Sequence, residues 1–193
     1  MQFVKETFTK TLEVKQSKFI AHLCPYSNYK ETLQLLKESN PKARHFVVAY
    51  RYLNEFGQIV EHSSDDGEPK GTSGKPSLMV LQGKELVNTA VIIVRYFGGT
   101  KLGTGGLVRA YSDAVNLVLE VADFFDYVKE KEIKVSVNYS DVRLLEYECQ
   151  NFSLSIYNKI FNDQVVYSIR GSELSIDKFL LKLKRVVCIL EDE

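Results

Sequence analysis

The sequence predicts an α+β protein with two domains, and three features of the chain support this. First, a β-branched run at 91–94 leads through a glycine-rich loop into a long amphipathic stretch, which is typical of a buried strand followed by a helix. Second, short segments of alternating apolar residues have the length and period of strands. Third, the C-terminal third has elements in the order strand, helix, strand, strand, helix, strand, which is the ferredoxin-like pattern. A boundary near Asp126–Lys131 gives domains of 1–128 and 129–193.

The first part of the chain predicts a hairpin, a helix and a second hairpin. The expected elements are two strands within Phe3–Leu23 with a turn at Lys15–Ser17, a helix that ends at Asn40-Pro41, a strand at His45–Tyr52 and its partner at Gln58–Ser63. Asn28 and Glu31 have the spacing of a capping box, so the helix should begin at Asn28. Pro41 disfavours helical geometry at Asn40 and should end it there.

A long polar loop, DDGEPKGTSGKP at 65–76, separates these elements from the centre of the chain. Long ordered loops inside a compact domain are often functional. Pro76 suits the first position of a helix and Gly83 the residue after its end, which predicts a second helix between them.

The centre of the chain combines a buried strand, five glycines and a long helix. The glycines are Gly98, Gly99, Gly103, Gly105 and Gly106, and the expected apolar stripe of the helix is Leu107, Tyr111, Ala114, Val118 and Val121. Such glycine density indicates either left-handed backbone or a close approach. A helix that begins there offers free N–H groups and a positive dipole end to an anion. Neither the Walker A nor the dinucleotide spacing is present, since Val108 takes the third glycine position. The alternative is that the glycines only permit tight strand–helix packing.

Two loops that each lead to a helix start predict one shared hollow if they lie side by side. Four cations would surround it: Lys70, Lys75, Lys101 and Arg109. The full set of candidate binding residues is Asp65, Asp66, Glu68, Lys70, Lys75, Arg95, Lys101, Gly103, Gly105, Gly106 and Arg109.

The acidic residues of the first loop have two interpretations. Asp65, Asp66 and Glu68, with His62 nearby, have side chains that can hold Mg²⁺ or transfer protons. Alternatively, Asp66 shapes a turn with Gly67, and the acids pair with Lys70 and Lys75. No spacing is diagnostic of a metal site, so we expect neither a metal nor a cofactor.

Two arginines near the glycines also need partners. Arg95 ends an otherwise buried strand, so its charge requires a carboxylate or a ligand phosphate. Arg109 and Asp113 are four residues apart on the long helix, a spacing that predicts a local ion pair.

The C-terminal third follows the βαββαβ pattern with recognisable ends. The expected elements are a strand at Glu130–Asn138, a helix capped by Ser140 or Asp141, strands at Leu154–Phe161 and Gln164–Ile169 around a turn at Asn162-Asp163, a helix after Gly171-Ser172 that carries Leu174, Phe179 and Leu183, and a strand at Arg185–Leu190. The acidic end at 191–193 should be a solvated tail.

Composition limits the class of protein. The 193 residues carry a formal net charge of zero, so contact with nucleic acid requires a local basic patch. Cys24, Cys149 and Cys188 lack the spacing of a zinc site or a disulfide framework and should be small buried residues in a reducing compartment. The N-terminus lacks the apolar segment of a signal peptide, and no run is long enough to span a membrane. We therefore expect a cytoplasmic protein.

The two central motifs resemble those of a known family. DDGEPKGTSGKP at 65–76 and VIIVRYFGGTKLGTGGLVRAY at 91–111 are similar to the signatures of the IMPACT (YigZ-type) family, in the expected order. The resemblance implies a first domain of the ribosomal-protein type, an α+β sandwich, and a ferredoxin-like second domain similar to those of elongation factor G. Eukaryotic members regulate translation and carry an extra N-terminal RWD domain, whereas this chain starts directly at the core. The resemblance assigns no catalytic residue.

We therefore expect a regulator of translation that binds RNA or a ribosome-associated factor, without catalysis. The alternative is an enzyme that acts on a phosphorylated small molecule or nucleotide at the glycine-rich loops. The sequence does not specify the oligomeric state.

Overall fold

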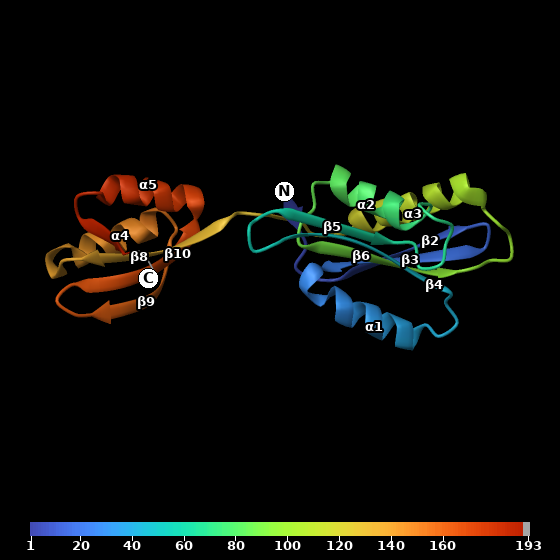
Figure 1. Cartoon of the computed structure of the whole chain (residues 1–193), viewed down its shortest axis with the longest axis horizontal. Helices are drawn as coiled ribbons and strands as arrows, with labels where there is room; N and C mark the ends of the chain where they lie inside the picture. The colour runs from blue at the N-terminus through green and yellow to red at the C-terminus, as the bar shows by residue number, and fades with distance from the viewer. Residues whose placement is uncertain (191–193) are drawn as a thin grey trace. The chain divides into compact units, whose positions relative to one another are not determined.

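Figure 1 shows a computed structural model of the chain, in which residues 1–190 are described. The expected acidic tail at 191–193 lies outside the described residues. The chain divides into two compact units, Met1–Tyr127 and Val128–Glu193, and each is treated by itself.

A five-stranded antiparallel sheet forms the centre of the first unit. Its strands, in spatial order, are β2 (Phe8–Val14), β3 (Ser17–Pro25), β6 (Thr89–Tyr96), β4 (His45–Leu53) and β5 (Ile59–Ser64). Seven of the eight residues of β6 are buried. This strand is the middle of the sheet and has helices over both faces, which explains its continuous apolar run.

Helices cover the two faces of this sheet in different numbers. The α1 helix (Tyr29–Ser39) lies on one face, and α2 (Gly74–Gly83) and α3 (Gly103–Leu119) lie on the other (Figure 1). The larger core lies under α2 and α3, where the ring of Tyr111 meets that of Phe19 edge-on at a centroid distance of 5.0 Å. The smaller core lies under α1. The buried residues along α3 belong to the larger core and fix this helix against the sheet. Its first turn is therefore held at one end of the sheet.

A two-residue ribbon also joins the ends of the first unit. Strand β1 (Gln2–Phe3) pairs with β7 (Phe125–Asp126) in antiparallel register. The sequence does not indicate this pairing, because two residues carry no periodic pattern.

The second unit is a four-stranded antiparallel sheet with two helices. In chain order its elements are β8 (Glu130–Val137), a short 3₁₀ turn η2 (Tyr139–Asp141), α4 (Val142–Asn151), β9 (Ser155–Phe161), β10 (Val165–Ser172), α5 (Glu173–Leu183) and β11 (Val187–Leu190). The strand order is β11-β8-β10-β9. This order and the βαββαβ succession define a ferredoxin-like fold. The predicted α+β class with two domains is therefore confirmed.

Helix ends account for most of the differences from prediction. The α3 helix begins at Gly103, before rather than after Gly106, and α2 begins at Gly74, so that Pro76 is its third residue. Asn28 precedes α1 but its side chain makes no capping hydrogen bond, so the predicted capping box is wrong. A second 3₁₀ turn, η1 (Tyr26–Asn28), delivers the chain to α1 instead.

Three predicted core residues are exposed. Val121 lies beyond the end of α3, Leu174 points to solvent from the first turn of α5, and Cys188 is exposed on the edge strand β11. Cys24 and Cys149 are buried as expected, and burial raises the pKa of the Cys24 thiol to about 11.

Candidate functional site

The carboxylate of Asp65 lies at the start of α2, where it takes the place that an external anion could occupy. Its carboxylate accepts hydrogen bonds from the backbone N–H groups of Gly71 (2.7 Å), Ser73 (3.1 Å) and Gly74 (2.9 Å) and from the Ser73 hydroxyl (2.7 Å). Burial raises the pKa of Asp65, but these hydrogen bonds lower it by more, so its pKa lies below the ordinary value. The amides that begin α2 are thus already occupied by an internal anion.

Asp66 fixes the turn that follows. Its carboxylate accepts a 2.6 Å hydrogen bond from the backbone N–H of Phe46, and its carbonyl oxygen lies 2.8 Å from Nδ1 of His45. Asp66 also adopts a positive φ of 43°. Asp66 therefore has the turn-shaping role that the sequence left open, and His45 is a hydrogen-bonded structural residue. The predicted pairing of the acids with Lys70 and Lys75 is not found among the described residues.

Glu68 provides the carboxylate that Arg95 requires. The two side chains form a buried ion pair, and the Tyr111 hydroxyl donates to the same Glu68 oxygen at 2.8 Å. Burial first, and then the charge of Glu68, raise the pKa of Tyr111. This cluster joins the 65–76 loop to the end of β6 and to the third turn of α3. The predicted partner of Arg95 is thus a carboxylate of this loop.

Two of the central glycines are required for different reasons. A Cβ on Gly98 would lie 2.1 Å from the carbonyl carbon of Gln16, so this glycine lets the chain pass directly over the β2–β3 turn. Gly103 has a φ of 74°, which favours glycine at the start of α3. Gly105 meets no neighbouring atom within 4 Å of an added Cβ.

The start of α3 is open. Its N-cap position is Leu102, which provides no side-chain cap, and Gly103, Thr104 and Gly105 are exposed. The N–H groups of a first helical turn have no partner within the helix. Unlike α2, α3 therefore presents uncapped amides at its start.

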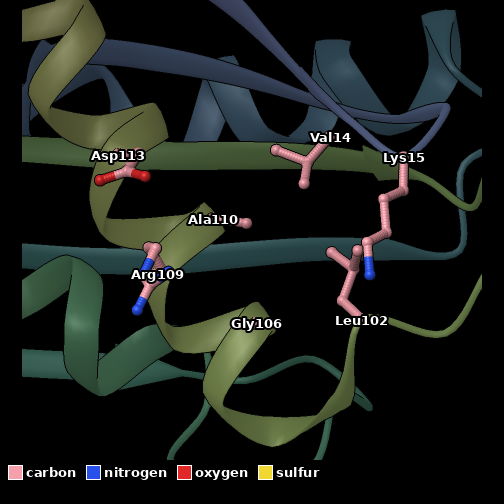
Figure 2. A pocket seen from close by; sticks show the side chains of 7 residues that line it. All are labelled: Val14, Lys15, Leu102, Gly106, Arg109, Ala110 and Asp113. Atoms are coloured by element: carbon pink, nitrogen blue, oxygen red, sulfur yellow. The ribbon is translucent and has the colours of Figure 1, made fainter.

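A pocket of about 220 Å³ lies beside this first turn (Figure 2). Its lining residues are Val14, Lys15, Leu102, Gly106, Arg109, Ala110 and Asp113. Of the predicted site residues, Gly106 and Arg109 line it, and no residue of the 65–76 loop does. The wall opposite α3 comes from the turn between β2 and β3 instead. Lys15 was missed as a site residue because its turn lies about 90 positions from α3 in sequence.

Four cations in the two loops and on α3 lack side-chain partners within the described residues. Lys70, Lys75, Lys101 and Arg109 are exposed, and within residues 1–190 their side chains make no ion pair or hydrogen bond. The predicted ion pair between Arg109 and Asp113 is absent from this described part, and the two side chains point apart (Figure 2). No group of three metal-binding side chains occurs among the described residues.

A comparison with known families identifies the first domain. The profile of the Impact N-terminal domain matches residues 15–119, which is more than half of the chain. The chain belongs to the IMPACT family. The match covers both central motifs and all eleven predicted site residues.

Bacterial relatives extend the similarity to the second domain. A Haemophilus influenzae protein named IMPACT family member is 33% identical over 174 residues, covering 89% of this chain and 84% of the relative. Bacillus subtilis YvyE is 31% identical over 182 residues, covering 91% and 82%, and Escherichia coli YigZ is 41% identical over 110 residues, covering 55% and 54%.

A solved structure has the same fold over the whole chain. A crystal structure described as that of a hypothetical protein matches with a TM-score of 0.68 at 28% identity, covering 100% of this chain and 97% of that one. The structure of Yih1, described as a two-domain translational regulator, matches 62% of this chain and 46% of its own at 22% identity and a TM-score of 0.34. That description is of Yih1 alone. No helix in the described part of this chain is long and apolar enough to cross a membrane.

Proposed function

We propose that this IMPACT-family protein regulates translation in the cytoplasm by binding RNA, and that the first domain contacts RNA phosphates around the start of α3. The observation that carries the proposal is an exposed, uncapped helix start that is flanked in the chain by Lys101 and Arg109, both without side-chain partners within residues 1–190. Regulation of translation is what the family resemblance implies.

The contrast between α2 and α3 supports a bound anion at the second helix. At α2 the protein supplies Asp65, whose carboxylate satisfies three backbone N–H groups. At α3 the equivalent groups face solvent, and the bare glycines Gly103 and Gly105 allow a close approach. A phosphate oxygen is the kind of acceptor that such a helix start binds.

Local charge supports RNA over an uncharged partner. The whole chain has no net charge, yet Lys70, Lys75, Lys101 and Arg109 all lie in or next to the two loops and are free to pair with phosphates. The ferredoxin-like second domain recurs in proteins that bind RNA or the ribosome, which supports the proposal only by analogy of fold.

An enzyme acting on a phosphorylated small molecule has less support. The pocket of about 220 Å³ is smaller than the several hundred Å³ usual for ligand clefts. Asp65 and Glu68, the carboxylates best placed for acid–base chemistry, are held by internal hydrogen bonds.

The test is the salt dependence of RNA affinity. We expect a fluorescent single-stranded RNA to bind more weakly as salt rises, because phosphate contacts release counterions. Lys101→Gln should reduce the slope of log K against log salt by about 0.7, the change expected for one lost phosphate contact on a single strand. Lys10→Gln, an exposed lysine on β2, is the matched control and should leave the slope unchanged.

Three outcomes would count against this proposal. Affinity that stays flat with salt would exclude phosphate contacts. Capture of a ribosome-associated protein that persists after ribonuclease treatment, with no RNA binding by the purified chain, would assign the surface to a protein partner. A rise in melting temperature with a nucleotide and Mg²⁺ would favour the enzyme alternative.

A further inference from the structure

We infer that the pocket between the β2–β3 turn and α3 binds a free aliphatic α-amino acid. Arg109 would bind the carboxylate, Asp113 the ammonium group, and Val14, Leu102 and Ala110 the apolar side chain. This site does not include the amides of α3, but it shares Arg109 with the cations proposed above to contact phosphates.

The charges of the pocket are complementary to a zwitterion. Arg109 and Asp113 both line it, and within residues 1–190 neither side chain has an ion pair or a hydrogen bond. Residues four apart on a helix are neighbours, with about 5–6 Å between their Cβ atoms. Two opposite charges so close normally pair with each other, whereas here the side chains point apart (Figure 2). A ligand with adjacent carboxylate and ammonium groups on one carbon satisfies both.

An anion alone or a cation alone fits less well. A phosphate or a simple carboxylate would meet the Asp113 carboxylate as well as Arg109. An amine would meet Arg109 and Lys15 as well as Asp113. Opposite charges on one small molecule avoid both repulsions.

The floor of the pocket is apolar. Figure 2 shows the Ala110 methyl group pointing into the space between Val14 and Leu102. Ala110 is buried, and Val14 and Leu102 are half-buried members of the main core. Gly106 leaves room for Leu102, since an added Cβ would lie 3.1 Å from the Leu102 Cβ. The pocket therefore has a fixed apolar wall beside its charges.

The size of the pocket limits the ligand. Its volume of about 220 Å³ equals roughly seven waters at about 30 Å³ each. An aliphatic amino acid such as leucine has a comparable number of non-hydrogen atoms. The opposite wall is held in place because Lys15 and Gln16 adopt positive φ values of 46° and 65° in a tight turn. The aliphatic stem of Lys15 can cover the ligand while its ammonium remains in solvent.

The test compares leucine with analogues that each lack one charge. L-leucine, 4-methylpentanoate and 3-methylbutylamine are titrated into the full-length protein while methyl signals of Val14, Leu102 and Ala110 are followed by NMR. We expect leucine to bind at least about tenfold more tightly than either analogue, since it alone makes both charge-assisted contacts. Asp113→Asn should weaken leucine binding to the level of 4-methylpentanoate and leave the acid unaffected. Arg109→Gln should weaken leucine and the acid but not the amine.

The matched control is Asp123→Asn, an exposed aspartate outside the pocket, which should keep the preference for leucine. The inference is overturned if leucine at concentrations on the order of 10 mM moves none of these methyl signals, since the Kd would then be weaker than about 10 mM. It is also overturned if Asp113→Asn keeps the preference for leucine over the acid. RNA titration of Asp113→Asn, which lies outside the proposed phosphate contacts, and of Lys101→Gln, which lies outside the pocket, distinguishes this failure from failure of the proposed RNA site.

Discussion

Glu68 is the residue on which the candidate site most depends. Its carboxylate holds the buried guanidinium of Arg95 and the hydroxyl of Tyr111, and Nε of Arg95 already lacks a hydrogen-bond partner. We expect Glu68→Gln to lower the free energy of unfolding by about 3–5 kcal/mol, because it leaves a buried charge without a counter-charge. Urea denaturation followed by circular dichroism measures the change.

Two further variants separate charge from hydrogen bonding in this cluster. Tyr111→Phe removes only the hydroxyl and should cost about 1 kcal/mol. Glu120→Gln, an exposed residue just after α3, should change little. Equal losses for Glu68→Gln and Glu120→Gln would show that the buried ion pair is not important for stability.

Asp65 makes the stability of the first domain sensitive to acid. Its pKa is depressed in the folded protein, so its contribution is complete above the unfolded value of about 3.9 and is lost as pH falls through the lower folded value. We expect Asp65→Asn to be less stable than the unmodified protein at neutral pH, with the difference shrinking below about pH 4. Thermal melts from pH 7 to strongly acidic pH measure this. A difference that is constant over the whole range would contradict the assignment.

At the scale of elements, alanine substitutions at two glycines of the β6–α3 segment should change the free energy of unfolding in opposite directions. Gly98→Ala places a Cβ 2.1 Å from backbone of the β2–β3 turn, so we expect a loss of about 1–3 kcal/mol or more. Gly105→Ala meets nothing within 4 Å and lies inside α3, so we expect a gain of about 0.5–1 kcal/mol. Chemical denaturation of the two variants is the measurement. A loss for both would mean that the helix start is more crowded than described.

The helices and strands were largely predictable, because the spacing of apolar residues indicates their type and turn residues indicate their ends. The buried run of β6 and the βαββαβ succession are examples, since long periodic segments leave a strong pattern. Helix starts were less predictable: Gly103 begins α3 because it can adopt positive φ, and sequence alone does not specify which of five glycines does so.

The candidate site was predictable only in part. Sequence reasoning found the two loops, the open start of α3 and the need of Arg95 for a carboxylate. The sequence did not indicate that the Asp65 carboxylate would accept hydrogen bonds at the start of α2, or that Lys15 would form part of the pocket wall. Contacts between segments distant in sequence depend on the packing of the whole domain.

At the scale of the whole molecule, each unit has its own core. The clusters beneath α1 and beneath α2 and α3 belong to the first unit, and a separate cluster around β8, β10, α4 and α5 belongs to the second. We therefore expect a fragment of residues 1–127 to fold by itself. A well-dispersed ¹H–¹⁵N spectrum of that fragment is the measurement. A spectrum with the narrow amide dispersion of an unfolded chain would mean that the second unit is needed for the first to fold.

The pairing of β1 with β7 can form only late during synthesis of the first unit. Gln2 and Phe3 leave the ribosomal exit tunnel before their partners Asp126 and Phe125, which follow more than 120 residues later. At about 5–20 residues per second, the first strand waits roughly 6 to 25 seconds for its partner. The two ends of the domain can therefore close only after every other strand of the first unit has emerged, so this pairing is a late step of folding on the ribosome.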